Sequence, residues 1–461
     1  MKKFIYIIFF TLIYNFSFFN VKSSEIQIKN PQEEKILQET KKIKDWNFLV
    51  YAASNNDLFD SALRNVSQMM EVGSTQNINI LVQLDTFGKK EICRYYVEKN
   101  RLIPLDLHQN SPDSISGTPE NLYKFAKWGI ENFPATHQAF VVWDHGSGIE
   151  DPSIWGKILN NVEIFKDRGI AFNTTFQTYL TNQDLKNVLE SISKNLLSNK
   201  KIDIFAMDAC NMAMLEVASQ IKNAVNFMVG SENIEPAAGW NYKKVLLPFE
   251  NKTMTPEEFS KHIVKAYKAE YEHKDIKYTQ SALKLEKIDL LEKNVDEASS
   301  CLLEILKSKD KNKIISLIKK IRNSRQLTTT FPDDAYSSDG SYIDMYHFYK
   351  SFLEKINQSL SSFKEKVLIQ NLSAVLYYGL HLIFENVIEN VANVNLSNAK
   401  GLAIYFPPKK IHGSYLKTVF AQNNNWKNFL KEYLINSKLM YGKNKQKNKT
   451  KSTQIQYKQI C

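Results

Sequence analysis

The chain has 461 residues, of which 43% are hydrophobic and 12% aromatic, and it contains only 15 glycines and 12 prolines. A chain of this size and composition can bury a large core, which excludes intrinsic disorder and collagen-like or linker-dominated proteins. Four cysteines are too few for a disulfide framework in a chain of this length. The net charge of +11 is partly local, because residues 437–461 form a lysine-rich tail that we expect to be disordered. No aromatic stacking pattern accompanies this tail, so we expect no nucleic-acid partner.

The first residues have the pattern of a secretory signal peptide. Two lysines precede the apolar run Phe4–Phe19, and residues 21–24 supply small side chains for cleavage. We therefore expect a signal peptide over 1–24, a spacer or short pro-segment over 25–44, and a secreted or periplasmic product. An uncleaved anchor is the alternative, although the run is short for a membrane span. No later stretch has 18 or more uninterrupted apolar residues, so no stable span is expected after cleavage.

Hydrophobic periodicity predicts alternating strands and helices through residues 45–250. Expected strands cover 46–53, 78–84, 93–97, 138–143, 202–208 and 226–232, and expected helices cover 57–70, 118–132, 181–197 and about 214–221. Thr118 and Thr181 are expected to cap the second and third of these helices. Residues 149–180 show no strong periodicity and are expected to form a long loop. This order predicts an α/β fold with a parallel-rich sheet flanked by helices on both faces.

Beyond residue 250 the pattern is mainly helical. Residues 251–436 are expected to form a helical and mixed C-terminal lobe that completes the fold, with Thr255 capping its first helix. Further helices are expected near 290–306, 314–321 and 342–353, and strand-like runs occur at 280–285 and 402–406.

Polar side chains follow two of the expected strands, at the point where each strand ends. His145 and Gly146 follow the strand at 138–143, and Asp208 and Cys210 end the strand that begins at residue 202. The stretch between His145 and Cys210 is long enough for a crossover between parallel strands. Most free cysteines are simply small buried hydrophobes, but ligands of open α/β sheets bind at the carboxyl ends of the strands. The paired motifs therefore favour a functional thiol and imidazole at one edge of a sheet.

This pair of residue types points to acyl-transfer chemistry on an amide or ester. A thiolate is a competent nucleophile, and a neighbouring imidazole can take up the proton of the thiol. The backbone N–H groups of Gly146 and Cys210 are candidate donors to an oxyanion.

The motifs resemble those of the clostripain-like family of cysteine peptidases, in the caspase-like clan. The resemblance covers about Trp46 to Leu434 and is carried by Trp-Asp-His-Gly-Ser-Gly (143–148), Arg-Gly-Ile-Ala-Phe (168–172), Asp-Ala-Cys-Asn-Met (208–212), Ser-Glu, Glu-Pro and Gly-Trp-Asn-Tyr (within 231–242) and Gly-Leu-Ala-Ile-Tyr-Phe-Pro (401–407). It implies a caspase-like fold and an endopeptidase acting on proteins or peptides through a dyad of His145 and Cys210.

The resemblance also implies a pocket for Arg or Lys before the cut bond, formed by Asp208, Ser231, Glu232 and the position of Ala238. Family members selective for basic residues commonly carry a second acid just before Gly-Trp, where this chain has Ala238. We therefore expect Arg or Lys selectivity to be weakened or shifted. A structural role for Asp208, as a cap near the following helix, is the alternative.

Clostripain-like enzymes are often cut between the two motifs, which makes Lys157, Lys166 and Arg168 candidate processing sites and predicts a monomer or a self-processed two-fragment form. The chemistry requires no cofactor, and no acidic run has the spacing of a calcium site, so calcium dependence is left open. Two alternatives share the same fold: a catalytically impaired binding protein, favoured by Ala238, and a transpeptidase using the same dyad.

Overall fold

The computed structural model describes residues 41–149, 169–332, 340–357 and 363–440. The predicted signal peptide, most of the spacer and the basic tail beyond residue 440 lie outside these ranges, so those assignments stay predictions. Everything described from Lys42 onward belongs to one unit.

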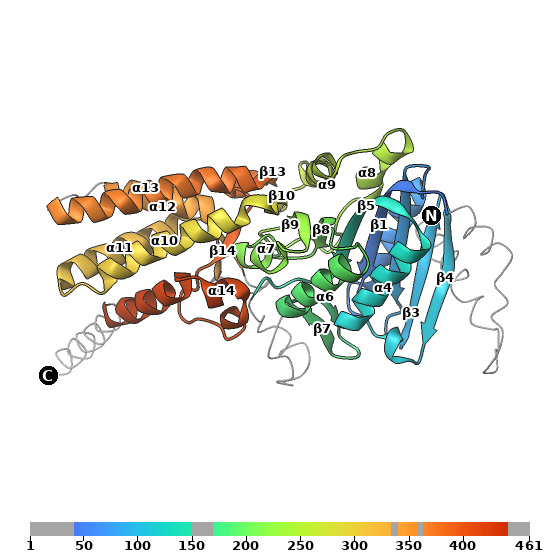
Figure 1. The fold of residues 1–461 in the computed structure, drawn as a ribbon, viewed down its shortest axis with the longest axis horizontal. Coiled ribbons are helices and arrows are strands. Elements are labelled where there is room, and N and C mark those ends of the chain that lie inside the picture. The colour runs from blue at the N-terminus through green and yellow to red at the C-terminus, as the bar shows by residue number, and fades with distance from the viewer. Residues whose placement is uncertain (1–40, 150–168, 333–339, 358–362, 441–461) are drawn as a thin grey trace, which may run out of the picture. The chain divides into compact units, whose positions relative to one another are not determined.

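A nine-stranded sheet forms the centre of the described chain (Figure 1). In spatial order its strands are β13 (Val387–Ala392), β10 (Thr279–Lys284), β9 (Val225–Gly230), β8 (Ile202–Asp208), β5 (Ala135–Trp143), β1 (Lys44–Ala52), β2 (Ile78–Asp85), β3 (Glu91–Glu98) and β4 (Arg101–Gln109). The five strands from β9 to β2 are all parallel, and the strands outside them pair antiparallel. The predicted parallel-rich α/β fold is confirmed.

Helices cover both faces of this sheet. One group comprises α3 (Phe59–Val72), α8 (Tyr242–Leu246) and α9 (Pro256–Tyr271), and the other comprises α4 (Pro119–Asn132), α6 (Asn182–Asn195) and α7 (Leu215–Ile221). Phe48 packs into the core with α9, whereas its neighbour Leu49 lies against α4. Because β1 is buried on both faces, its sequence is a continuous apolar run. The predicted caps are confirmed, since Thr118, Thr181 and Thr255 each accept a hydrogen bond from a first-turn backbone N–H.

The region beyond residue 250 adds both helices and strands. Its helices are α10 (Ile288–Leu306), α11 (Lys311–Leu327), α12 (Met345–Asn357), α13 (Phe363–Asn386) and α14 (Val419–Asn423). A small sheet of β11 (Thr330–Phe331), β12 (Tyr342–Asp344) and β14 (Ala403–Tyr405) lies in the same region. Because β10 and β13 extend the main sheet, this region completes the fold of the core. Within the described ranges, α13 is the one helix long and apolar enough to cross a membrane, and it packs against α10 and α12.

Several elements differ from the prediction for identifiable reasons. The expected loop over 149–180 contains a hairpin, β6 (Gly169–Asn173) with β7 (Thr178–Thr181). Strands of five and four residues are too short to show a period, and Ala171 in β6 has a positive φ of 65°. The edge strand β4 was also missed, because one side of it faces solvent and Pro104 interrupts its pattern. The helix expected from residue 342 starts at Met345, after β12.

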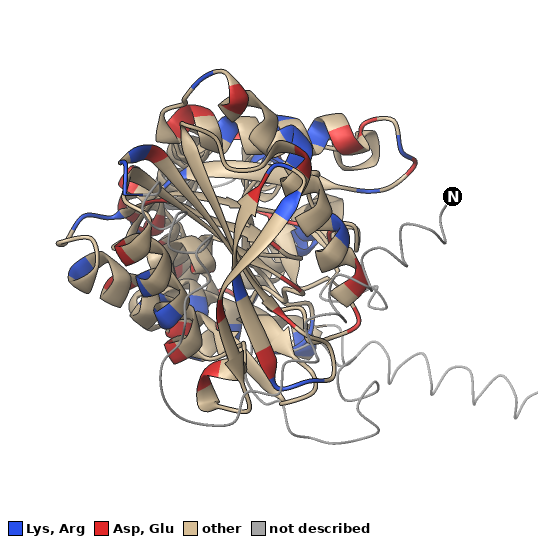
Figure 2. Ribbon diagram, turned by 90° about the vertical axis from the view of Figure 1, so that its right-hand side faces the viewer, with Lys and Arg blue, Asp and Glu red and all other residues tan. Residues whose placement is uncertain are grey.

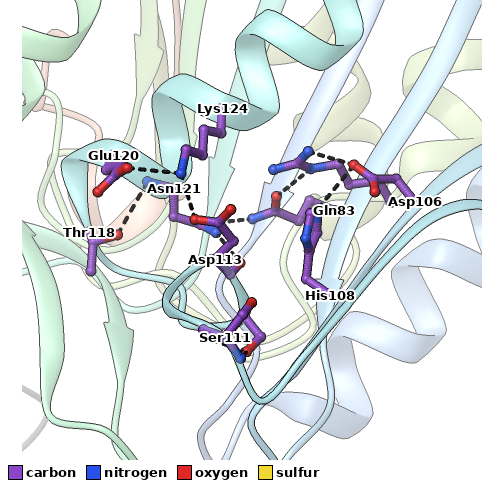
Figure 3. A network of polar contacts seen from close by, with 11 residues as sticks. Gln83, Asp106, His108, Ser111, Asp113, Thr118, Glu120, Asn121 and Lys124 are labelled. Atoms are coloured by element: carbon purple, nitrogen blue, oxygen red, sulfur yellow. Dashed lines mark hydrogen bonds and ion pairs between the residues drawn. The ribbon is translucent and has the colours of Figure 1, made fainter. Parts of the chain in front are cut away.

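A polar network joins α4 to the sheet near the carboxyl ends of β1 and β2 (Figure 3). Buried Arg94 donates to Gln83 (3.0 Å) and pairs with Asp106 (2.7 Å). Gln83 donates to Oδ1 of Asn121 (2.7 Å), which also accepts from the hydroxyl of Tyr51 (2.9 Å). Buried hydrogen-bond networks of this kind rigidify the elements that they join. Charged residues of both signs are interspersed over the surrounding helices and loops (Figure 2).

Candidate active site

Parallel pairing of β5 with β8 brings the two polar motifs together. Trp143 lies opposite Asp208 in the register, and the backbone N–H of Asp144 donates to the carbonyl of Asp208 (3.3 Å). The main chain of Gly146 lies against Cys210: a Cβ on this glycine would overlap the carbonyl oxygen of Cys210 and lie 3.0 Å from its nitrogen. The predicted adjacency of these strands is confirmed, and it requires glycine at position 146 because any side chain would push the two strand ends apart.

The His145 imidazole is hydrogen-bonded to one carboxylate and lies within the electrostatic influence of a second. Its Nε2 lies 2.9 Å from Oδ1 of Asp57, in the loop after β1. Asp144, directly before it, is buried and accepts from the side chain of Asn56 (2.7 Å) and from the backbone N–H of Phe172. Burial lowers the pKa of His145, but the Asp57 hydrogen bond and the charges of Asp144 and Asp57 outweigh it, so the net pKa is raised. Burial raises the pKa of Asp144 to about 7.

The Cys210 thiol is bonded to the loop that follows β9. Its Sγ accepts a hydrogen bond from the backbone N–H of Glu235 (3.2 Å). Burial raises the pKa of Cys210 to about 12; the charges of Glu235 and Asp208 raise it further, and backbone hydrogen bonds from Glu235 and Gly146 lower it in part. The thiol is therefore protonated in this state, and a base must remove its proton before it can act as a nucleophile.

Asp208 presents a buried carboxylate beneath the same loop. Its Oδ2 accepts from the backbone N–H of Trp240 (3.1 Å) and from the hydroxyl of Tyr242 (2.9 Å). Gly239 passes directly over the carboxylate with φ of 60°, and a Cβ there would lie 2.8 Å from Oδ2. Burial raises the pKa of Asp208 to about 6, although these hydrogen bonds oppose the shift.

Glu235, which the sequence did not predict for this site, supplies a second carboxyl group beside Asp208. It is buried and its carboxyl is hydrogen-bonded to that of Asp208, while Gln280 donates to its Oε1 (3.3 Å). Burial, followed by the charge of Asp208, raises the pKa of Glu235 well above its ordinary value. Two carboxyl groups in contact cannot both ionise easily, so they hold a shared proton. The Glu-Pro pair quoted among the motifs was the available signal.

Ser231 and Glu232, both predicted for the pocket, make their described contacts elsewhere. The hydroxyl of Ser231 is bonded to that of Thr279 (2.9 Å) on β10. Glu232 accepts from the backbone N–H of Gly401 (2.9 Å), and its carboxyl is bonded to that of Asp344. These two residues therefore join β9 to the C-terminal region, whereas the carboxyl group bonded to Asp208 is that of Glu235.

The remaining predicted site residues lie on the surface or outside the described ranges. Ala238 is exposed, and its carbonyl accepts from the side chain of Asn65 on α3 (3.1 Å). Lys157, Lys166 and Arg168 fall within residues 150–168, which the structure does not describe, so a processing site there stays a prediction. In the described ranges, no group of three or more His, Cys, Asp or Glu side chains is arranged to hold a metal ion.

A parallel-rich sheet flanked by helices, with a thiol and an imidazole at the carboxyl ends of adjacent strands, defines a caspase-like α/β protein. The profile of the Clostripain family matches residues 50–442, so the chain belongs to the clostripain family of cysteine peptidases. It is 22% identical to clostripain of Hathewaya histolytica over 250 residues, which cover 49% of this chain and 46% of that protein. The match thus spans about half the length of that curated relative.

Two solved structures share the fold across most of the chain. A secreted C11 cysteine protease of Bacteroides thetaiotaomicron, in complex with an irreversible peptide inhibitor, matches with a TM-score of 0.56 and 14% identity, covering 84% of this chain and 99% of that one. An inactive zymogen C11 protease of Parabacteroides distasonis matches with a TM-score of 0.52 and 16% identity, covering 83% and 98%. At these identities the likeness concerns the fold.

Proposed function

We propose that this chain is an exported cysteine endopeptidase in which Cys210 is the nucleophile and His145 the general acid and base. The observation that carries the proposal is the contact of the Gly146 main chain, one residue after His145, with Cys210, just beyond the carboxyl ends of adjacent parallel strands. Neither residue type alone is diagnostic, but a thiol and an imidazole at the same sheet edge support nucleophilic catalysis.

The first half of the reaction forms a thioester. Sγ of Cys210 attacks the carbonyl carbon of the scissile peptide bond while its proton passes to His145. The oxyanion that develops is stabilised by the backbone N–H of Gly146. The carbon–nitrogen bond then breaks, and the leaving amine takes the proton from His145. Because the pKa of the resting thiol is about 12, transfer of its proton to His145 is coupled to the attack.

The second half hydrolyses the thioester. A water molecule gives a proton to His145 as its oxygen attacks the acyl carbon, the carbon–sulfur bond breaks, and the proton returns to the sulfur of Cys210. The new carboxyl end leaves, and the resting thiol is restored.

The pair of Asp208 and Glu235 supports cleavage after Arg or Lys. The two carboxyl groups share a proton in a buried site next to the nucleophile. A guanidinium or ammonium entering this site would replace that proton and leave both carboxylates paired with a cation. In this proposal Glu235 carries the role for which Ala238 lacks a side chain.

Export is supported by the signal pattern of the first 24 residues and by the description of the Bacteroides thetaiotaomicron neighbours as secreted. The substrates proposed are proteins or peptides outside the cytoplasm. Cutting at Lys157, Lys166 or Arg168 would give the two-fragment form, and amino-terminal sequencing of the purified protein tests it.

Cleavage-site profiling on a mixed peptide pool tests the function, with Cys210→Ala as the matched inactive control. We expect cuts after Arg and Lys that disappear in Cys210→Ala, while the melting temperature of the variant stays within a few degrees of the parent. Turnover that survives the substitution would refute the dyad. An added amine that captures the acyl group in place of water would identify a transpeptidase, and parallel assays with calcium and with a chelator test metal dependence.

A further inference from the structure

We propose that Asp57 is a positioning residue for His145, holding the imidazole through Nε2 so that Nδ1 exchanges the proton of the Cys210 thiol. The inference rests on the proposed function, in which His145 is the general acid and base. Its basis is a direct contact between two strand ends: Nε2 of His145 lies 2.9 Å from Oδ1 of Asp57. Asp57 thereby acts through His145 and adds a third residue to the proposed arrangement of His145 and Cys210.

The loop that carries Asp57 is fixed by its buried neighbour Asn56. The side-chain amide of Asn56 donates to Oδ1 of Asp144 (2.7 Å) and to the carbonyl of Phe172 (2.8 Å). Its Oδ1 accepts from the backbone N–H of Leu58 (2.9 Å), which closes a turn around Asp57. Asn56 is fully buried and uses both its donors and its acceptor. The carboxylate of Asp57 is therefore aimed by a rigid turn although the carboxylate itself faces solvent.

The second neighbour, Asn55, ties the same loop to two other turns at this edge of the sheet. Its Oδ1 accepts from the backbone N–H of Gly88 (2.9 Å) and from the hydroxyl of Thr175 (2.7 Å). Its carbonyl accepts from the backbone N–H of Thr174 (3.1 Å). The position of Asp57 is thus set by the loops that follow β1, β2 and β6 together, which is the support that a positioning group needs.

The contact decides which ring nitrogen carries hydrogen. A neutral imidazole has one donor and one acceptor nitrogen, and a carboxylate only accepts, so Nε2 of His145 is the donor to Asp57. Nδ1 is then the basic nitrogen, and in this proposal it is the one that exchanges the proton of the Cys210 thiol. When Nδ1 takes the thiol proton, the imidazolium is stabilised by Asp57 at Nε2 and by the charge of buried Asp144.

The solvent exposure of Asp57 distinguishes a positioning role in catalysis from a role in holding the fold together. The Asp57 side chain is 71% exposed, and ion pairs of this kind add little to folding stability. Its loss should leave the fold unchanged and alter the reaction. The hydrogen bond to His145 lowers the pKa of Asp57, so the carboxylate is ionised throughout the neutral range.

The test compares full-length Asp57→Asn, Asp57→Ala and Asp57→Glu with Asp60→Asn, which removes a nearby exposed carboxylate. We expect kcat on an arginyl peptide to fall roughly 10- to 100-fold in the Asn and Ala variants, as for a misplaced catalytic group. KM should stay within about twofold, because in this proposal Asp57 acts through His145 and not on the substrate. Asp57→Glu should recover part of kcat, and Asp60→Asn should match the parent.

Nitrogen NMR of the His145 ring supplies a readout independent of turnover. The titratable groups that act on the ring are Asp57 and Asp144, and only Asp57 changes. We expect the pKa of His145 to fall in Asp57→Asn, because the hydrogen bond and the charge that raise it are lost, and the neutral ring to lose its preference for hydrogen on Nε2. An unchanged ring titration, or an unchanged kcat, would overturn the proposal. So would a fall in kcat that accompanies a lower melting temperature in all three Asp57 variants.

The two proposals fail in different ways. If the parent protein is inert and Cys210→Ala behaves identically, the proposed function fails, while the ring titration still shows whether Asp57 sets the tautomer. If the parent is active and Asp57→Asn matches it in kcat and pH profile, only the role of Asp57 is refuted.

Discussion

Substitution of Asp208 by Asn is the sharpest test of selectivity for basic residues. The change keeps the size of the side chain and its ability to accept from Trp240 and Tyr242 (3.1 and 2.9 Å), but it removes the charge that would pair with a substrate cation. Its partner Glu235 remains as a single carboxyl group. We therefore expect folding to be retained and recognition of Arg and Lys to be lost.

The magnitude follows from the burial of the site. Asp208 is 4% exposed, so a cation bound there is largely desolvated, and removing one partner of such a pair costs about 2–5 kcal/mol. At 1.36 kcal/mol per decade, kcat/KM for an arginyl substrate should fall roughly 30- to 5,000-fold. A citrulline substrate, which has the same shape without the charge, should change by less than about threefold because it never used the charge.

The assay measures kcat/KM for matched arginyl and citrullyl peptides from pH 4.5 to 8.5 in the parent and in Asp208→Asn. Since burial raises the pKa of Asp208 to about 6, the parent should lose its preference for arginine as the pH falls through that value and the carboxylate is protonated. Asp208→Asn should show no such acid limb. An unchanged ratio of arginyl to citrullyl cleavage would refute the pocket assignment, and a similar loss in Glu235→Gln would support the pair.

Three further predictions concern the other buried groups. Gly146→Ala should lower kcat/KM at least roughly 100-fold in a peptide assay, because its Cβ would overlap the main chain of Cys210 and displace the catalytic groups; normal activity would show that the strand ends can separate. Iodoacetamide should label resting Cys210 at pH 7.5 roughly 1,000-fold more slowly than free cysteine by mass spectrometry, since its pKa is about 12; rapid labelling would contradict the raised pKa of the thiol. Burial raises the folded pKa of Glu232 well above its ordinary value and that of Asp344 to about 6, so the stability they contribute is complete below about pH 4 and is lost as the pH rises through the folded values. The melting temperature should therefore fall between pH 5 and 8, and Glu232→Gln should make this fall smaller. An equal fall in the variant would argue against a proton shared between Glu232 and Asp344.

The parts of the fold that sequence patterns predicted are those with strong local signals. Thr118, Thr181 and Thr255 cap helices as expected, because capping depends on a few neighbouring residues. The parallel strands β1, β2, β5 and β8 were recognised because burial on both faces makes their sequences continuously apolar. The short hairpin of β6 and β7 and the edge strand β4 carry weak periodicity, and they were missed for that reason.

The residues of the candidate site also differ in how well the sequence predicts them. His145 and Cys210 could be proposed because each directly follows a recognisable strand, and parallel strands end at the same edge. The same rule applied to β1 would have pointed to Asp57, four residues after the expected end of that strand at residue 53. Glu235 could not be assigned by counting residues, since its position in the pocket depends on how the loop over 231–240 folds back across Asp208.

The amino-acid sequence by itself determined the class of fold, the capped helices and the two strand ends that carry a thiol and an imidazole, because these depend on periodicity and on residues close together in the chain. Only the tertiary structure decided that Glu235 faces Asp208, that Asp57 faces His145, and that Ser231 and Glu232 face the C-terminal region. The physical reason is that a pair of carboxyl groups or an ion pair between loops forms through non-local packing, which leaves no repeating pattern in the sequence.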